Sequence, residues 1–139
     1  MLSLLTTFHI LTFATVLGGR TLLVPLLKKT IANGTNERLD ELQDTISIAR
    51  YSDFALIFAI LSGLLLFFSH GISLTETHWS FKLKLVVFGL LIIDVGAYHI
   101  AQARIVNHYD SQMLPALQRL NFLAVLLMSG MVFFATFSA

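Results

Sequence analysis

His9 and His70 are the residues of this 139-residue chain whose type and spacing point most directly to chemistry. They belong to two consecutive apolar stretches, and if these form antiparallel helices the histidines come to the same end. Two neutral imidazoles on facing helices can bind one haem iron. Gly63 lies seven residues before His70 on the same side of its helix, where it leaves room for the flat macrocycle. The pattern favours a b-type haem with His9 and His70 as its iron ligands.

Three further residues near this end fit the same interpretation. Lys82 and Lys84 begin the third apolar stretch, where they offer cations to the haem propionates. Trp79 precedes them and suits the aromatic belt at a membrane surface. A plainer alternative stays open, in which the lysines anchor the helix end, His70 reaches water and His9 hydrogen-bonds a neighbouring helix.

A second set of polar residues is expected in the other half of the apolar stretches: Arg20, Asp53, Asp94, Tyr98 and His99. Asp94 lies close to the middle of its stretch, too deep for a short side chain to reach water. We therefore expect Asp94 to pair with Arg20 or else to be protonated. The set is interpreted either as a structural polar clasp or as a proton route.

The elements that must position these residues are four apolar stretches, at about 2–27, 36–70, 81–103 and 114–138. Each is near the ~20 residues that a helix needs to cross a bilayer. Hydrophobic residues make up 56% of the chain and charged ones 12%, and the apolar runs lack the alternation of a membrane barrel. The sequence predicts one all-α domain over residues 1–139, a membrane four-helix bundle with short connections and a cytoplasmic extension of the second helix.

Charge and composition indicate which partners and which membrane orientation to expect. The chain has no cysteine, which excludes disulfides and thiolate metal sites, and its net charge of +1 suggests no nucleic acid partner. The first stretch lacks a basic start, so we expect a retained helix rather than a signal peptide. Basic residues favour the first and third connections, which the positive-inside rule assigns to the cytoplasm. We therefore expect both termini to face outward, most simply from a bacterial inner membrane.

Several short motifs carry a resemblance to a known group of proteins. Phe8-His9-Ile10, followed by Gly18-Gly19-Arg20 and Pro25, resembles the first helix of the HemJ-type protoporphyrinogen oxidases and of the related CopD-like and DUF2269-like small membrane proteins. Trp79, Lys82-Leu83, Tyr98-His99 and Arg104 are similar to the third helix of the HemJ group. The resemblance covers about a third of the chain. It implies a four-helix bundle that binds haem b, with His9 and a lysine of the third helix at important positions.

Three functions are consistent with these patterns. The first is a haem b protein that passes electrons between a quinone-like or porphyrinogen donor and a partner, as an oxidoreductase or its electron-transfer component. The second is a cofactor-free accessory subunit of a larger membrane complex. The third, ranked last, is a small proton-coupled permease that uses Asp94 and the histidines. Membrane lipid is a partner in each case, and we expect a homo-oligomer or a subunit of a membrane complex.

Overall fold

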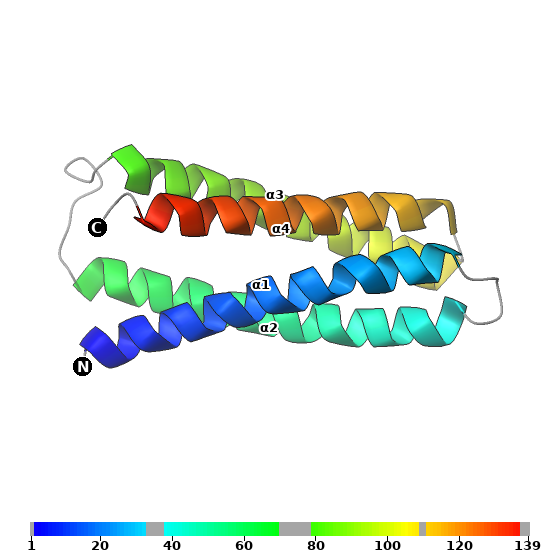
Figure 1. Cartoon of the computed structure of the whole chain (residues 1–139), viewed down its shortest axis with the longest axis horizontal. Helices are drawn as coiled ribbons and strands as arrows, with labels where there is room; N and C mark the ends of the chain where they lie inside the picture. Colours follow the sequence, from blue (N-terminus) through cyan, green and yellow to red (C-terminus); the bar gives the residue numbers. More distant parts are fainter. Residues whose placement is uncertain (1, 33–37, 70–78, 109–110, 137–139) are drawn as a thin grey trace.

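The computed structural model describes residues 2–32, 38–69, 79–108 and 111–136, and these residues are helical throughout. The elements are α1 (Leu2–Ala32), α2 (Arg38–Ser69), α3 (Trp79–His108), the short 3-10 helix η1 (Ser111–Met113) and α4 (Leu114–Thr136). Figure 1 shows the four long helices lying side by side along one axis. The expected all-α four-helix architecture is confirmed.

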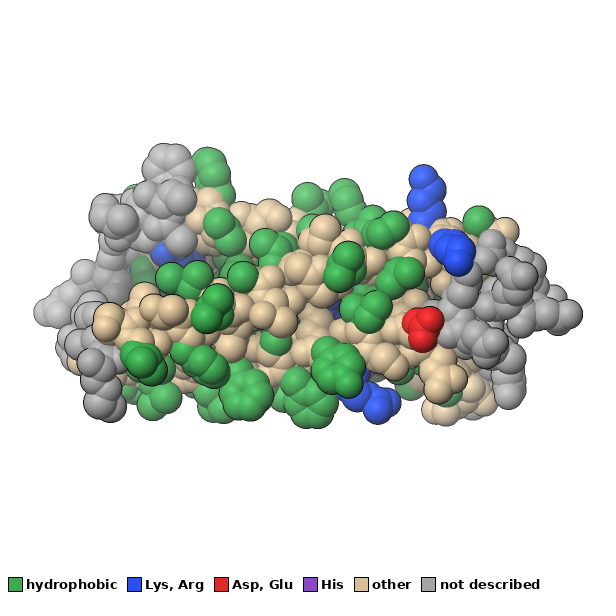
Figure 2. All heavy atoms as spheres, turned by 60° about the horizontal axis from the view of Figure 1, so that its bottom comes forward, with side chains coloured by type: hydrophobic (Ala, Val, Ile, Leu, Met, Phe, Trp, Pro, Cys, Tyr) green, Lys and Arg blue, Asp and Glu red, His purple; other side chains and the backbone are tan. Residues whose placement is uncertain are grey.

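Each long helix contains a segment that is long and apolar enough to cross a membrane. These segments are Ser3–Ala32, Leu42–Ser69, Phe81–Asn107 and Leu114–Phe133. Large apolar side chains cover much of the exposed surface, and in Figure 2 the charged side chains in view gather mostly toward one end of the long axis. A water-soluble protein would bury most of these apolar side chains, so the chain is an integral membrane protein.

Two helices extend further than their apolar runs predict. α1 ends at Ala32 rather than near residue 27, and α3 ends at His108 rather than near residue 103. The added turns contain lysine and arginine, which are good helix formers, and no glycine or asparagine occurs in α1 between Leu27 and Asn33-Gly34. A helix can therefore continue past the apolar boundary. The expected start of the second helix near residue 36 lies outside the described residues.

The bundle consists of two helix pairs, and the backbones of the two pairs approach each other between α1 and α4. α1 packs on α2, α3 packs on α4, and α1 also contacts α4. Because consecutive helices run in opposite directions, α1 begins and α4 ends at the same end of the bundle (Figure 1). We call this end, with the second part of α2 and the first part of α3, the outer half. The opposite end is the inner half.

The interior is packed unevenly along the bundle axis. The inner half contains a cluster of buried apolar side chains that includes Leu23, Leu27 and Leu117, and a second cluster around Val16 and Leu91 lies near the centre. Beyond the central cluster, α2 buries Ser62, and no described side chain nearer the outer end is buried in any of the four helices. The inward faces of the helices are thus closely packed in the inner half and more open in the outer half.

Hydroxyl groups on α1 are satisfied within the helix itself. Five threonine hydroxyls donate a hydrogen bond of 2.7–3.0 Å to the backbone carbonyl four residues earlier. They belong to Thr7, Thr12, Thr15, Thr21 and Thr30. In hydrocarbon a hydroxyl finds no water, so this local bond removes the cost of an unpaired donor. These threonines need no partner on another helix.

Candidate functional site

His9 is held by a hydrogen bond to a serine of the facing helix. Nδ1 of the half-buried ring lies 3.0 Å from Oγ of Ser62 on α2. The same Oγ lies 2.7 Å from the carbonyl oxygen of Phe58 and 3.1 Å from that of Ala59, both on its own helix. A serine hydroxyl has one hydrogen, and these carbonyls can only accept it. If the hydroxyl donates to one of these carbonyls, its oxygen accepts from Nδ1–H of His9, and the proton of the neutral ring lies on Nδ1.

The second ring nitrogen of His9 is then left with a free lone pair. In the neutral imidazole a proton on Nδ1 means that Nε2 is an acceptor. No other described side chain or backbone group hydrogen-bonds the ring. Histidines that bind metals usually hold their other N–H on an oxygen in this way, which fixes the tautomer and the ring orientation. The geometry makes Nε2 of His9 available to a metal or to a proton.

Gly63 is the neighbour that allows this position of the ring. A Cβ added at Gly63 would lie 3.0 Å from Cε1 of His9, closer than nearly all real Cβ contacts. We expected Gly63 to leave space for a macrocycle, and the structure places the imidazole of His9 in that space. The reason is that α1 packs directly on α2, so the glycine provides room for a side chain from the facing helix.

The other residues of the predicted haem site lie around the outer end. Trp79 and Lys82 are exposed and Lys84 is half-buried, all in the first turns of α3. The end of α2 reaches the start of α3 through Phe67 and Phe81, whose rings stack with centroids 5.6 Å apart. His70, the other predicted iron ligand, lies outside the described residues.

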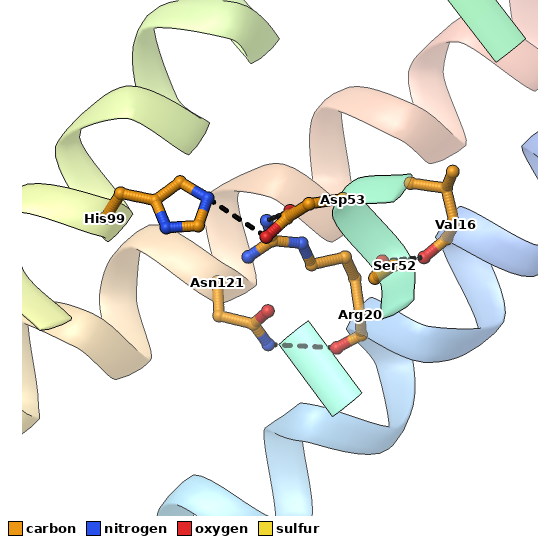
Figure 3. Close-up of polar contacts among 6 residues, drawn as sticks. All are labelled: Val16, Arg20, Ser52, Asp53, His99 and Asn121. Atoms are coloured by element: carbon orange, nitrogen blue, oxygen red, sulfur yellow. Dashed lines mark hydrogen bonds and ion pairs between the residues drawn. The ribbon is translucent and has the colours of Figure 1, made fainter. Parts of the chain in front are cut away.

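The inner half contains a group of charged side chains centred on Asp53 (Figure 3). Arg20 of α1, which is 1% exposed, places Nη2 2.5 Å from Oδ1 of Asp53 on α2. Oδ2 of Asp53 lies 2.9 Å from Nε2 of His99 on α3, an ion-pair distance without hydrogen-bond alignment. One carboxylate therefore contacts an arginine and a histidine from two other helices.

Neighbouring side chains complete this arrangement. The guanidinium carbon of Arg20 lies 4.6 Å from the centroid of the Tyr98 ring, within the range of a cation–π contact. Asn121 of α4 donates from Nδ2 to the backbone oxygen of Arg20 at 2.9 Å, and Ser52 of α2 donates to the backbone oxygen of Val16 at 3.1 Å. All four long helices contribute, and we call Arg20, Asp53, Asp94, Tyr98, His99 and Asn121 the inner cluster.

The partner of Arg20 differs from the one we expected. The structure pairs Arg20 with Asp53 rather than with Asp94, because Asp53 lies on α2, which packs directly against α1. Asp94 is 4% exposed, and neither of its carboxylate oxygens has a hydrogen-bond partner among the described residues. The alternative for an unpaired carboxyl at this depth is the protonated form.

Two functional contacts were missing from the sequence interpretation. Ser62 was not singled out, since a serine in an apolar helix commonly bonds only its own carbonyl. Asn121 was not singled out either, although an isolated amide in an apolar stretch is a signal that a polar partner lies on another helix. Within the described ranges no three His, Cys, Asp or Glu side chains converge on a metal position. Haem iron needs only one or two axial ligands from the protein.

No family model matches the chain, and neither a curated protein nor a solved structure is significantly similar to it. The resemblance of its short motifs to the HemJ group therefore stays a prediction from the sequence.

Proposed function

We propose that this protein binds haem b in its outer half through Nε2 of His9 and has a redox role in the membrane. The observation that supports the proposal is the hydrogen bond from His9 to Ser62. A Ser62 hydroxyl that donates to a carbonyl of α2 accepts from Nδ1–H of His9, and in that tautomer Nε2 can bind iron.

Two further features fit a haem in this position. Nearer the outer end than the central cluster, Ala59 and Ser62 of α2 are the only buried residues among the described ones, which fits a planar ligand between the helices there. Lys82 and Lys84 begin α3 at the same end and suit the haem propionates. His70 or Lys84 would supply the second axial ligand. Bound haem would provide one-electron chemistry, with a quinone-like or porphyrinogen donor as in the HemJ resemblance.

The test is the absorption spectrum of the purified protein in lipid nanodiscs after addition of haem. The wild type should show a low-spin b-type spectrum, and His9→Ala should lose it because iron loses its ligand. Ser62→Ala should keep a weaker site, with haem affinity lower by about 10–100-fold, since the ring is no longer oriented. Thr15→Ala is the matched control, because Thr15 is exposed and bonds only its own helix.

The proposal would be wrong if the wild type and His9→Ala bound haem equally, or if neither bound it. A protein without haem that purified with stoichiometric partners would favour the accessory-subunit function instead.

We also propose that the inner half faces the cytoplasm of a bacterial cell. Lys28, Lys29 and Arg50 lie toward the inner end, whereas Lys82 and Lys84 are the only basic residues of the outer half. Basic residues are retained on the cytoplasmic side during insertion, which places both termini outside.

A further inference from the structure

The inner cluster contains more polar atoms than it pairs. Six of its buried atoms have no hydrogen-bond partner in the part of the chain that the structure describes: Nη1 of Arg20, Oδ2 of Asp53, both carboxylate oxygens of Asp94, the Tyr98 hydroxyl and Oδ1 of Asn121. Buried polar atoms of this kind are normally bonded to internal water or belong to a working site. Because they all lie in membrane-crossing helices, bulk water cannot satisfy them.

The side chains that carry these atoms, together with His99, form a series of neighbouring groups that we describe as a path through the inner half. Asp94 and Tyr98 are four residues apart on α3, so their side chains are neighbours on one face of the helix. Tyr98 lies beneath the guanidinium of Arg20, which is bound to Asp53. Asp53 in turn contacts His99, whose side chain is 48% exposed. The path thus joins a half-exposed imidazole to a buried carboxyl at the middle of the α3 segment Phe81–Asn107.

The charges on this path allow one proton to have two positions. Arg20 from α1 and Asp53 from α2 cancel one another, and α4 contributes the neutral Asn121 within the described residues. The groups left to titrate are Asp94 and His99 on α3, because Tyr98 is neutral as a phenol. The cluster is neutral when Asp94 is protonated and His99 is not, and also when His99 is protonated and Asp94 is ionised. Hydrocarbon surroundings disfavour every state with a net charge.

We propose that the inner cluster is a proton-transfer site, in which one proton moves between His99 and Asp94. An N–H bond of the His99 imidazolium breaks, an O–H bond forms on the Asp94 carboxylate, and the Tyr98 hydroxyl with bound water carries the proton between them. No electron is transferred, and the total charge of the cluster does not change. The site brings a proton from the surface of the inner half to the centre of the membrane, and it does not depend on whether haem binds in the outer half.

Infrared spectroscopy of the full chain in lipid vesicles tests this inference, because a protonated carboxylic acid has a C=O stretch distinct from that of a carboxylate. The wild type should show this band, and Asp94→Asn should lose it, which assigns the band. Asp53→Asn should also lose it although Asp94 is present, since the uncompensated charge of Arg20 then requires an ionised Asp94. Asp44→Asn, at an exposed position of α2, is the control that should keep the band.

His99→Gln separates a shared proton from a carboxyl that is simply neutral. With the imidazole gone, the proton has one position left, so the band should be stronger than in the wild type or persist to higher pH. Identical bands in the wild type and His99→Gln, across the pH range in which histidine titrates, would reduce the cluster to a structural clasp. A wild type without the band at any pH would also overturn the proposal. Gel filtration identifies folded variants, and if Asp53→Asn fails to fold, His99→Gln still decides the question.

Discussion

Asp53 is the residue on which the inner cluster depends, because its two oxygens face two different helices. Oδ1 binds Arg20 of α1 and Oδ2 contacts His99 of α3. α2 and α3 are not among the helix pairs that pack directly, so this carboxylate is a polar link between them. A buried ion pair adds little over apolar packing, but removing one member leaves a charge without compensation. Asp53 and Arg20 should therefore behave as a unit.

A double-mutant cycle on Arg20 and Asp53 measures this dependence. Arg20→Met should destabilise the protein by about 3–5 kcal/mol, because it leaves the Asp53 carboxylate unpaired in the bundle. Adding Asp53→Asn should recover much of that loss, since the amide needs no cation. Unfolding in detergent followed by circular dichroism provides the free energies. The matched cycle of Arg20 with Asp94→Asn should show weaker coupling, and equal coupling in both cycles would contradict the pairing.

Five of the six members of the inner cluster were predicted from the sequence, all except Asn121, but their pairing was not. Residue type and depth placed Arg20, Asp53 and Asp94 in the same part of the membrane, since an α-helix rises by about 1.5 Å per residue. Depth alone leaves Asp53 and Asp94 as equal candidates for Arg20. The choice depends on which helices are adjacent and how each is rotated about its axis, and a single sequence with four uniformly apolar helices contains little information on rotation.

The contact between α1 and α2 depends on small residues that face the partner helix. A Cβ added at Gly19 would lie 3.1 Å from Cβ of Ser52, whereas a Cβ at Gly18 would meet nothing within 4 Å. Adjacent glycines of one helix therefore have different roles. In a membrane, where no hydrophobic force drives helices together, close backbone approach through such residues supplies much of the packing energy.

Replacing each of these glycines by alanine should separate the two roles. Gly19→Ala should destabilise the bundle by about 1–3 kcal/mol, because the methyl group pushes Ser52 away and disturbs its bond to the carbonyl of Val16. Gly18→Ala should be neutral or stabilising by up to about 1 kcal/mol, since alanine is the better helix former. Thermal unfolding of the two variants in the same detergent gives the comparison. A Gly18→Ala variant as unstable as Gly19→Ala would mean that Gly19 does not lie in a close contact.

Element types were predictable here because the membrane restricts the choice to helices, whereas element ends were not. Apolar composition locates the part of a helix that lies in hydrocarbon, but α1 and α3 continue into turns rich in lysine and arginine. Those turns are helical through backbone hydrogen bonds and neighbouring packing, such as the buried Thr30 and Ile105. Hydropathy measures neither the backbone hydrogen bonds nor the packing of these turns.

In the molecule as a whole, the two halves of the bundle differ in packing, and each half contains a different candidate site. The inner half is closely packed and contains the charged cluster, while the outer half is more open and contains His9 with a free Nε2. The α1–α2 pair contributes to both, because α1 carries His9 as well as Arg20. A proton site in the inner half and a haem in the outer half would occupy successive depths of one bundle. The orientation of the chain in the membrane then decides which of the two sites lies nearer the cytoplasm.

Single cysteines at the two ends of α1 test that orientation, since the chain has no cysteine of its own. Ser3 and Ala32 are both exposed and begin and end the first membrane-crossing segment. The basic residues Lys28, Lys29 and Arg50 favour a cytoplasmic inner half, so Ala32→Cys should be protected from a membrane-impermeant thiol reagent in intact cells and Ser3→Cys should react. Both should react after the cells are permeabilised, which controls for access. Reaction of Ala32→Cys alone in intact cells would reverse the orientation, placing His9 near the cytoplasm and the half-exposed His99 on the outer side.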